Sequence, residues 1–392
     1  MPHDLTAPLL WRQPRLMAIG PGHAVEGLRA LLRSTRSARA FLVGSPSTRE
    51  PLGRLRTVLE DHGVAVAVST PVPPEPTTAD CERRRAEAAA FRPDLVVAVG
   101  GGSVLDVAKL VAALHDRSEP VTAFYGIGVL AGRRTTLVCV PTTAGTGSEV
   151  SPNALLLDDA SCTKKAVISP DLVPDAALVD PTLMLSLPPA LTATTGIDAL
   201  CHCLEAYANL AAHPFTDVWA LRGVELIGAW LPAAVHDSSH LAARTAVATG
   251  SLLGGLCLGP VNTAAVHALA YPLGGRFHLA HGLSIALLLP AVVAFNVPAM
   301  PARYATLARA LGAAGGRDDT TMAAELPGRL TALIRACGVP LGLATHGLSR
   351  PDFPALVESA LTVTRLLKNN PRPVTPADAL AIYEAAFATP SA

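Results

Sequence analysis

One carboxylate and three histidines in the second half of the chain have the residue types and spacing of a metal site. Asp198 and His202 are four residues apart in a segment with helical periodicity, so their side chains lie one turn apart on one face. His267 and His281 follow further along the chain. One carboxylate oxygen and three imidazole nitrogens suit a borderline divalent ion such as Fe²⁺ or Zn²⁺, which acts as a Lewis acid when a further position is open to substrate. Spacing alone leaves the alternative that each histidine is a hydrogen-bonded core residue.

Two similar patterns favour structural roles instead. His236 and His240 are also four residues apart, but the Asp-Ser-Ser sequence between them predicts a turn. Cys201 and Cys203 lie in the segment that holds Asp198, and buried thiols inside an alanine-rich helix explain them best.

A glycine cluster in the first half of the chain predicts an anion site. The apolar run 95–99 has the character of a buried strand, and it leads directly into Gly100-Gly101-Gly102-Ser103 and then into a helical pattern. Glycines let the backbone approach a pyrophosphate closely, and the free N–H groups at a helix start bind negative charge. The alternative is that Ser103 and Asp106 form a capping box, and both interpretations can hold together.

A second loop of small polar residues follows the next predicted strand. Residues 141–149 include Thr142, Thr143, Thr146 and Ser148, and they come directly after the strand 136–140. The carboxyl edge of a parallel sheet is where open α/β sheets bind ligands. An ordinary strand-to-loop turn is the alternative.

The elements that must position these groups divide the chain into two parts. Short apolar strands at Leu16–Ile19, 40–43, 64–68, 95–99 and 136–140 alternate with helical patterns at 24–32, 55–62 and 83–91, which predicts a doubly wound, Rossmann-like parallel sheet. After Asp180-Pro181 a proline-rich connector at 185–189 leads into a region of helical period, with loops at 315–319 and 369–373. We therefore predict an α/β domain over residues 1–185 and an all-helical domain over residues 186–392.

Composition excludes several classes of partner. The 392 residues include 31 basic and 31 acidic side chains, which leaves no net field to hold a nucleic acid or a membrane surface. The seven cysteines form no CxxC pair and indicate a reducing compartment. The N-terminus lacks the pattern of a secretory signal, and the apolar run 283–294 is interrupted by Pro290 and is shorter than a membrane span. We expect a soluble, cytoplasmic protein.

Taken together, these motifs resemble the iron-containing (group III) alcohol dehydrogenase family, which has the dehydroquinate synthase-like fold. The resemblance runs from Gly20-Pro21-Gly22 to Asn370-Pro371-Arg372 and passes through the segments 100–109, 141–149, 196–202 and 267–282 in the family's order.

The resemblance implies roles for individual residues. The metal ligands would be Asp198, His202, His267 and His281, and the cofactor pyrophosphate would be surrounded by Gly100, Gly101, Gly102, Ser103 and Asp106. Five further positions would line the cofactor site: Thr142, Thr143, Thr146, Ser148 and Lys165. Asn153 falls where the family places a residue close to the substrate and the nicotinamide.

Two departures from the family pattern bear on the chemistry. Some relatives carry a further histidine one turn after the third ligand, often given a proton-transfer role, whereas this chain has Tyr271, whose phenol titrates far above an imidazole. Members that prefer NAD tend to carry an aspartate after the second strand, and here Gly44 is followed by Ser45, with Arg49 nearby. The missing carboxylate and the hydroxyl of Ser45 favour NADP(H) within a general NAD(P)(H) assignment.

We therefore predict reversible hydride transfer between a nicotinamide and a small aldehyde or alcohol bound to a divalent metal, Fe²⁺ or alternatively Zn²⁺, in a cleft between the domains. The cations Arg276, Arg365 and Lys368 would favour a carboxylated or phosphonate aldehyde if they reach the site. The alternatives are a metal-dependent lyase or cyclase of the dehydroquinate synthase type and a non-catalytic nucleotide-binding homologue. By analogy with the family we expect a homodimer or a larger homo-oligomer.

Overall fold

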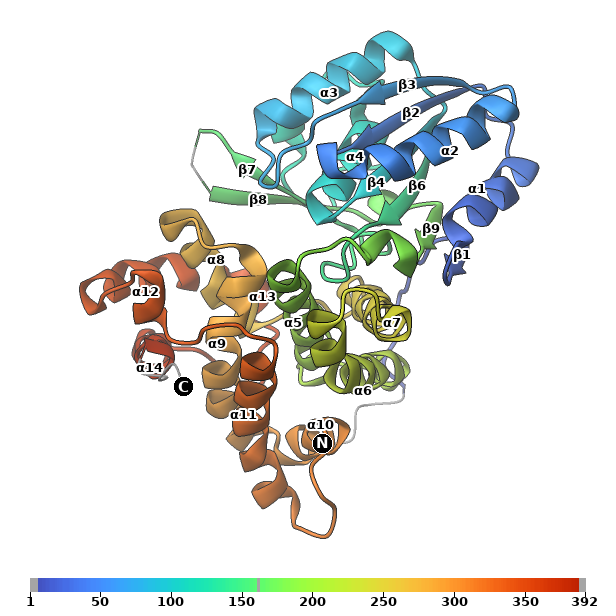
Figure 1. The fold of residues 1–392 in the computed structure, drawn as a ribbon. Coiled ribbons are helices and arrows are strands. Elements are labelled where there is room, and N and C mark those ends of the chain that lie inside the picture. Colours follow the sequence, from blue (N-terminus) through green and yellow to red (C-terminus); the bar gives the residue numbers. More distant parts are fainter. Residues whose placement is uncertain (1–5, 161–162, 388–392) are drawn as a thin grey trace. The chain divides into compact units, whose positions relative to one another are not determined.

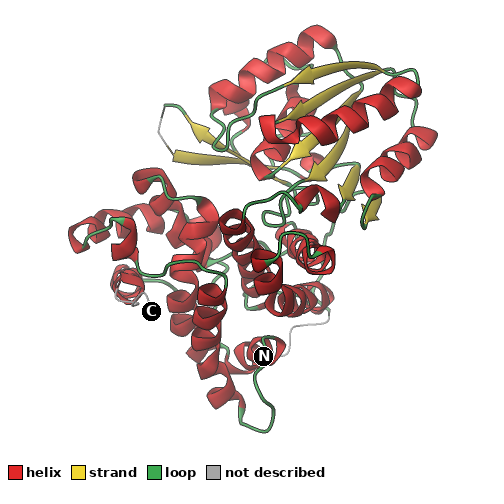
Figure 2. Cartoon of the chain, in the orientation of Figure 1, coloured by secondary structure: helices red, strands yellow, loops and turns green. Residues whose placement is uncertain are grey.

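The computed structural model describes residues 6–160 and 163–387, and it divides the chain into two compact units. One unit spans Trp11–Leu187, and the other begins at Pro188 and includes the segment that ends at Leu10. Strands are confined to the first unit and helices make up the second, as the colours of Figure 2 show. The predicted fold class, a Rossmann-like parallel-sheet domain followed by a helical domain, is confirmed.

The first unit is built on a parallel sheet of six strands (Figure 1). From one edge to the other they are β1 (Leu16–Ile19), β9 (Ala176–Val179), β6 (Thr136–Pro141), β4 (Leu95–Gly100), β2 (Arg39–Gly44) and β3 (Ala65–Ser69). Every residue of β4 is buried, which explains why its sequence is continuously apolar instead of alternating.

Helices cover both faces of this sheet and bury alternate residues of each strand. On one face α1 (His23–Ser34) and α2 (Arg49–Asp61) pack with Leu95, Val97 and Val99 of β4, while on the other α3 (Thr78–Phe91) and α4 (Gly102–Leu114) pack with Val96 and Ala98. The five predicted strands and three predicted helices are all present, with ends that coincide or are shifted by up to six residues.

Sequence analysis missed a strand of the main sheet and a small second sheet. Strand β9 follows Asp175 and separates β1 from β6. The second sheet has the order β5 (Gly126–Ile127), β8 (Thr163–Ile168), β7 (Asn153–Asp158), and β7 and β8 are antiparallel. The buried Lys109 of α4 fixes the start of this hairpin, because its Nζ donates to the carbonyl oxygens of Ser151 and Asn153 at 2.9 Å each.

The second unit consists of helices joined by short loops. In chain order they are α5 (Pro189–Tyr207), α6 (Pro214–His236), α7 (Leu241–Leu258), α8 (Ala265–Phe277), α9 (His281–Asn296), α10 (Pro301–Ala310), α11 (Asp319–Ala336), α12 (Phe353–Leu361), α13 (Thr364–Leu367) and α14 (Pro376–Phe387). Small residues let the first three helices approach closely: a Cβ added at Gly223 of α6 would lie 3.2 Å from the carbonyl oxygen of Gly250 in α7. The loops predicted at 315–319 and 369–373 are present, except that α11 already begins at Asp319.

Three helices of this unit are long and apolar enough to cross a membrane by length and composition alone: α6, α7 and a stretch from His281 to Ala299 that includes α9. The prediction that the run 283–294 is too short for a span is therefore wrong on length. Pro290 lies inside α9 without ending it, because α9 packs along α5, α8 and α11 and its interior is buried. Within the protein, 78% of the apolar stretch in α7 and 56% of the one that includes α9 are buried.

Candidate functional site

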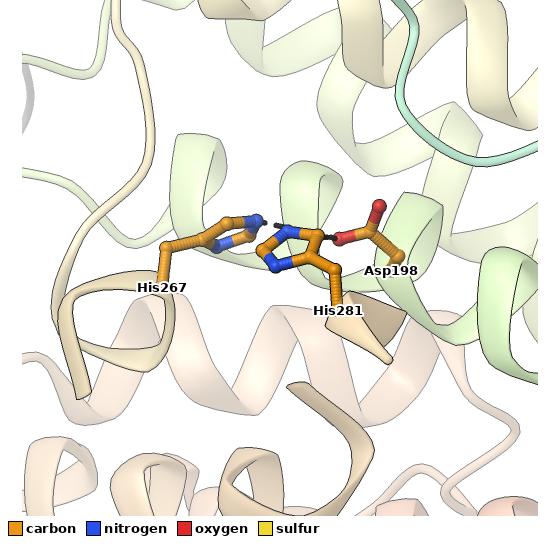
Figure 3. Close-up of side chains that lie close together, drawn as sticks. All are labelled: Asp198, His267 and His281. Atoms are coloured by element: carbon orange, nitrogen blue, oxygen red, sulfur yellow. Dashed lines mark ion pairs between the residues drawn. The ribbon is translucent and has the colours of Figure 1, made fainter. Parts of the chain in front are cut away.

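The four predicted metal ligands converge on one carboxylate oxygen. Asp198 Oδ1 lies 3.4 Å from His267 Nε2, 3.6 Å from His281 Nε2 and 3.7 Å from His202 Nε2. Figure 3 shows the rings of His267 and His281 turned toward the Asp198 carboxylate. The ligand atoms of Asp198, His267 and His281 all lie within 4.8 Å of one another, and the His202 ring stacks on that of His267 at 4.8 Å between centroids.

Three helices bring these side chains together. Helix α5 carries Asp198 and His202 one turn apart, α8 carries His267, and His281 is the first residue of α9. Gly282 allows α9 to begin against α5, because a Cβ at this position would lie 2.7 Å from the carbonyl carbon of Thr194. Without that close approach, His281 would be held away from Asp198.

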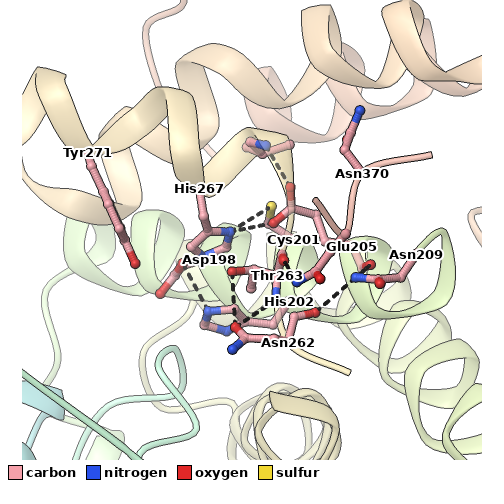
Figure 4. Close-up of polar contacts among 12 residues, drawn as sticks. Asp198, Cys201, His202, Glu205, Asn209, Asn262, Thr263, His267, Tyr271 and Asn370 are labelled. Atoms are coloured by element: carbon pink, nitrogen blue, oxygen red, sulfur yellow. Dashed lines mark hydrogen bonds and ion pairs between the residues drawn. The ribbon is translucent and has the colours of Figure 1, made fainter. Parts of the chain in front are cut away.

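Glu205 fixes the orientation of His267. Its Oε2 lies 2.6 Å from His267 Nδ1, and its Oε1 accepts a 2.6 Å hydrogen bond from the backbone N–H of Val266 (Figure 4). Both Glu205 and His267 are buried. When Nδ1 donates its proton to Glu205, the Nε2 lone pair points at Asp198, which is the arrangement that metal-binding histidines commonly have.

The charges in this cluster call for a cation between the ligand atoms. Asp198 Oδ1 and His267 Nε2 are both buried, and neither has a hydrogen-bond partner in the described part of the chain. Burial alone raises the pKa of the Asp198 carboxyl, but the imidazoles of His202, His281 and His267 outweigh it and hold the pKa below its usual value. Burial alone lowers the pKa of His267, and the Glu205 carboxylate reverses that effect and raises it well above its usual value. When His267 is protonated at Nδ1 alone, Asp198 Oδ1 and His267 Nε2 are two facing acceptors in a buried site, and a bound divalent ion would stabilise both, so the residues fit such an ion.

A network of asparagines anchors the turn that precedes α8. Asn209 Nδ2 donates to the carbonyl oxygens of Glu205 at 3.1 Å and of Asn262 at 3.2 Å, and Asn369 Nδ2 donates to that of Thr263 at 2.9 Å. Asn262 has a positive φ of 74°, a conformation that asparagine tolerates better than most residues. The turn therefore sets where α8 begins and so where His267 lies (Figure 4).

Tyr271 lies beside the cluster on the same helix as His267. Its ring centroid is 6.0 Å from that of His281, and its hydroxyl oxygen accepts a 3.0 Å hydrogen bond from Arg365 Nη2. Tyr271 is half-buried, so part of its side chain remains accessible beside the cluster.

The predicted phosphate loop lies at the carboxyl end of the sheet in the first unit. Strand β3 lies on one side of β2 and β4 lies on the other. The direction in which successive strands are added to the sheet therefore reverses between β2 and β4. Such a switch point is where open α/β sheets bind dinucleotides. The Gly100–Gly102 turn follows β4, and the N-terminus of α4 follows the turn, with Gly101 as its N-cap.

The second predicted loop packs directly against this turn. A Cβ at Gly102 would lie 2.6 Å from Thr146 Cγ2, and one at Gly101 would lie 3.3 Å from the Thr143 side chain. The backbone N–H of Thr142 donates to the carbonyl oxygen of Gly100 at 3.0 Å. The glycines are therefore required by the approach of the threonine loop as well as by any ligand.

The proposed capping box at the start of α4 does not form. The helix begins at Gly102, so Ser103 lies inside it, and its hydroxyl donates to the carbonyl oxygen of Pro74. The half-buried Asp106 carboxylate accepts hydrogen bonds from Ser148 Oγ at 2.5 Å and from the backbone N–H of Leu155 at 2.9 Å. Through these hydrogen bonds Asp106 connects the loop 141–149 and β7 to α4.

The other predicted cofactor and substrate residues lie on separate elements of the first unit. Lys165 is exposed on β8, and Asn153 begins β7 with its side-chain oxygen buried and without a hydrogen-bond partner among the described residues. Ser45 follows β2 directly, and its hydroxyl lies 2.9 Å from that of Ser47.

Sequence analysis assigned no role to Glu205. Its position three residues after His202 and seven after Asp198 places it on the same helix face, which is the signal that identifies it. The structural roles predicted for two other pairs are confirmed: His236 and His240 flank a turn, and Cys201 and Cys203 are buried. Burial raises the pKa of Cys201 to about 12, so it is a thiol in the metal-free protein. Of the seven cysteines, Cys162 lies outside the described residues, and the remaining six are free.

Two family patterns cover nearly the whole chain. Residues 14–181 match the iron-containing alcohol dehydrogenase family, and residues 192–387 match the C-terminal domain of the Fe-containing alcohol dehydrogenase family. The chain belongs to the iron-containing alcohol dehydrogenase family. It is a metal-dependent oxidoreductase of alcohols and aldehydes that uses a nicotinamide dinucleotide.

Individual relatives of this family match over most of their length. The chain is 41% identical over 337 residues to long-chain-alcohol dehydrogenase 1 of Geobacillus thermodenitrificans (strain NG80-2), with 84% of each protein covered. It is 31% identical over 377 residues to the sulfoacetaldehyde reductase of Bilophila wadsworthia (strain 3_1_6), with 93% of this chain and 97% of that protein covered. A crystal structure of 1,3-propanediol oxidoreductase superposes with a TM-score of 0.93 at 32% identity, covering 97% of this chain and all of that one.

Proposed function

We propose that this iron-type alcohol dehydrogenase reduces small aldehydes at a divalent metal held by Asp198, His202, His267 and His281. The observation that carries the proposal is the convergence of three imidazole Nε2 atoms within 3.4–3.7 Å of one buried carboxylate oxygen. A set of one oxygen and three nitrogen ligands accepts both iron and zinc, and iron is the ion for which the family is named.

Each part of the chain has a separate task in this reaction. When bound, the nicotinamide supplies the hydride and the divalent ion polarises the carbonyl oxygen of the aldehyde. Glu205 holds His267 in the tautomer that leaves Nε2 free to bind the ion. Tyr271, whose ring lies 6.0 Å from that of His281, remains the proposed catalytic side chain beside the cluster.

The loops of the first unit suit the dinucleotide. The N-terminus of α4 and the backbone of the Gly100–Gly102 turn would bind the pyrophosphate, with Thr142, Thr143 and Thr146 alongside. Preference for NADP(H) is supported by the end of β2, where no acidic residue lies between Gly44 and Arg49 to repel a 2′-phosphate. Lys165 and Asn153 remain proposed contacts of the cofactor and the substrate.

Substrate range, assembly and location follow from several smaller observations. One relative is named for reduction of sulfoacetaldehyde, an aldehyde with a negative charge at its far end, so we include anionic aldehydes among the substrates. A homo-oligomer is supported by exposed apolar side chains on α6, among them Phe215, Val218 and Trp230. A cytoplasmic location is supported by the free, buried thiols of the described residues.

Metal analysis of anaerobically purified protein tests this function. We expect about one iron or zinc per chain, loss of aldehyde-dependent NADPH oxidation after chelation, and its return with Fe²⁺ or Zn²⁺. The His267→Ala variant should lose most of its metal and activity, while His236→Ala, a change of the same type outside the cluster, should keep both. Full metal content and activity in His267→Ala would show that the four side chains do not form the metal site. Comparing kcat/KM for NADPH and NADH in the same assay tests the cofactor preference.

A further inference from the structure

Arg365 joins the metal cluster through Tyr271. It lies on α13, which packs against α8, and its Nη2 donates to the Tyr271 hydroxyl oxygen at 3.0 Å. Its guanidinium carbon is 5.8 Å from the centre of the Tyr271 ring, and that ring lies 6.0 Å from the His281 ring. Figure 4 shows Tyr271 extending from the same helix as His267 toward the level of Asp198. Tyr271 therefore lies between the permanent positive charge of Arg365 and the proposed metal ligand His281.

No carboxylate balances this charge within the described part of the chain. Arg365 forms no ion pair there, and the sequences of α8 and α13 contain no acidic residue. Of its five N–H donors, one is used by Tyr271. Arg365 is half-buried, so its charge is less screened by water than that of a fully exposed cation, yet it is still reachable.

We propose that Arg365 and Tyr271 form a receptor for the acid group of the substrate, so that the enzyme selects aldehydes carrying a carboxylate or sulfonate at the end opposite the carbonyl. The inference rests on the proposed function, because it requires an aldehyde with its carbonyl oxygen at the cluster. The planar guanidinium group of an arginine can donate two hydrogen bonds at once, one to each of two oxygens of such an acid group. The phenol oxygen accepts from Arg365 and keeps its own O–H free to donate to the same group.

The neighbouring cations provide a natural comparison. Arg276, near the end of α8, and Lys368, just after α13, are both exposed, and neither forms an ion pair in the described part of the chain. They carry the same charge as Arg365 but do not contact Tyr271. If general attraction of anions were the cause of selectivity, removing any of the three charges would reduce it by a similar factor.

The test uses the metal-loaded enzyme and two aldehydes of similar length, 4-oxobutanoate and pentanal. We expect the wild type to favour 4-oxobutanoate in kcat/KM. Arg365→Gln should lower kcat/KM for 4-oxobutanoate about 10- to 100-fold, the loss expected for a charge-assisted hydrogen bond. Pentanal should be reduced at nearly the wild-type rate, which also shows that the variant folds and holds its metal. Arg365→Lys should recover part of the selectivity, and Arg276→Gln should keep the wild-type ratio.

The possible outcomes separate this proposal from the one on which it rests. If neither aldehyde is reduced with NADPH or NADH, the proposed function itself is wrong. If both are reduced and Arg365→Gln leaves their ratio unchanged, the enzyme works as proposed but Arg365 does not recognise the substrate. An equal fall for both aldehydes in Arg365→Gln, without recovery in Arg365→Lys, would mean that the arginine only supports the fold around Tyr271.

Discussion

Among single residues, Glu205 contributes most to making the cluster suitable for a metal ion, because its carboxylate orients the imidazole of His267. A neutral imidazole can carry its proton on either nitrogen, and only the form protonated at Nδ1 presents a lone pair at Nε2. The 2.6 Å contact of His267 Nδ1 with Glu205 Oε2 keeps a proton on Nδ1, so Nε2 is the nitrogen left to bind an ion. The same carboxylate accepts the backbone N–H of Val266, so it fixes the ring and the helix start together.

Replacing Glu205 by glutamine should therefore weaken metal binding more than it disturbs the fold. The amide can still accept from Nδ1, but it lacks the negative charge that balances a cation bound at Nε2. We expect the dissociation constant for Zn²⁺, measured by competition with a chromophoric chelator, to rise about 10- to 100-fold. The melting temperature of the metal-free protein should change much less.

A glutamate on the surface provides the control for this prediction. Glu225 pairs with Arg222 at 2.8 Å on α6, and both side chains are exposed. Because exposed ion pairs contribute little, Glu225→Gln should bind Zn²⁺ as the wild type does. Equal affinity in Glu205→Gln and Glu225→Gln would mean that Glu205 is a buried structural acid with no influence on the ion.

At the scale of elements, the site depends on how closely α9 approaches α5. Gly282 makes this possible, and an alanine there would place its Cβ 2.7 Å from the Thr194 carbonyl carbon, a distance that real contacts do not reach. Gly282→Ala should push the first turn of α9 away, destabilise the protein by about 1–3 kcal/mol and move His281 out of reach of the ion. We expect a lower metal content by elemental analysis and a lower midpoint in urea unfolding.

Gly275 is the matched position for this comparison, because a Cβ added there, near the end of α8, meets no atom within 4 Å. Gly275→Ala replaces a helical glycine and should leave the metal content unchanged while making the fold slightly more stable. A Gly282→Ala variant that kept its full metal content would show that α9 can shift without displacing His281.

The elements themselves differ in how far the sequence predicts them. Continuous apolar runs such as β4 and periodic helices such as α1 are visible because local burial dictates their residue types. Strand β9 is only four residues long, and β7 and β8 pair with each other away from the main sheet, so no local periodicity marks them clearly. Asp106 has the spacing of a capping residue but serves a loop 42 residues away, which only the folded structure reveals.

At the scale of the whole molecule, the same distinction explains which parts of the site are predictable. Helical spacing places Asp198 and His202 side by side, because the two share one helix. The meeting of His267 and His281 with them depends on tertiary packing, so it came from family resemblance. The same spacing puts Glu205 on the face that carries Asp198, but the residues on α8 that Glu205 and Arg365 contact lie 62 and 94 positions away in the chain, so only the structure shows those contacts.

The two units hold their proposed ligands separately, so each ligand should stabilise its own unit most. Binding to the native state slows local opening in proportion to ligand occupancy, which hydrogen exchange detected by mass spectrometry reports peptide by peptide. Addition of Zn²⁺ to the metal-free protein should protect peptides from α5 and α8 most strongly, because these helices carry three of the four ligands. Addition of NADPH should instead protect peptides that contain the Gly100–Gly102 turn and the loop 141–149 most strongly.

In His267→Ala the protection by Zn²⁺ should vanish while that by NADPH persists, since the substitution leaves the first unit intact. If Zn²⁺ protected the Gly100–Gly102 turn and left α5 and α8 unaffected, the ion would bind to the first unit. The assignment of its ligands would then be wrong.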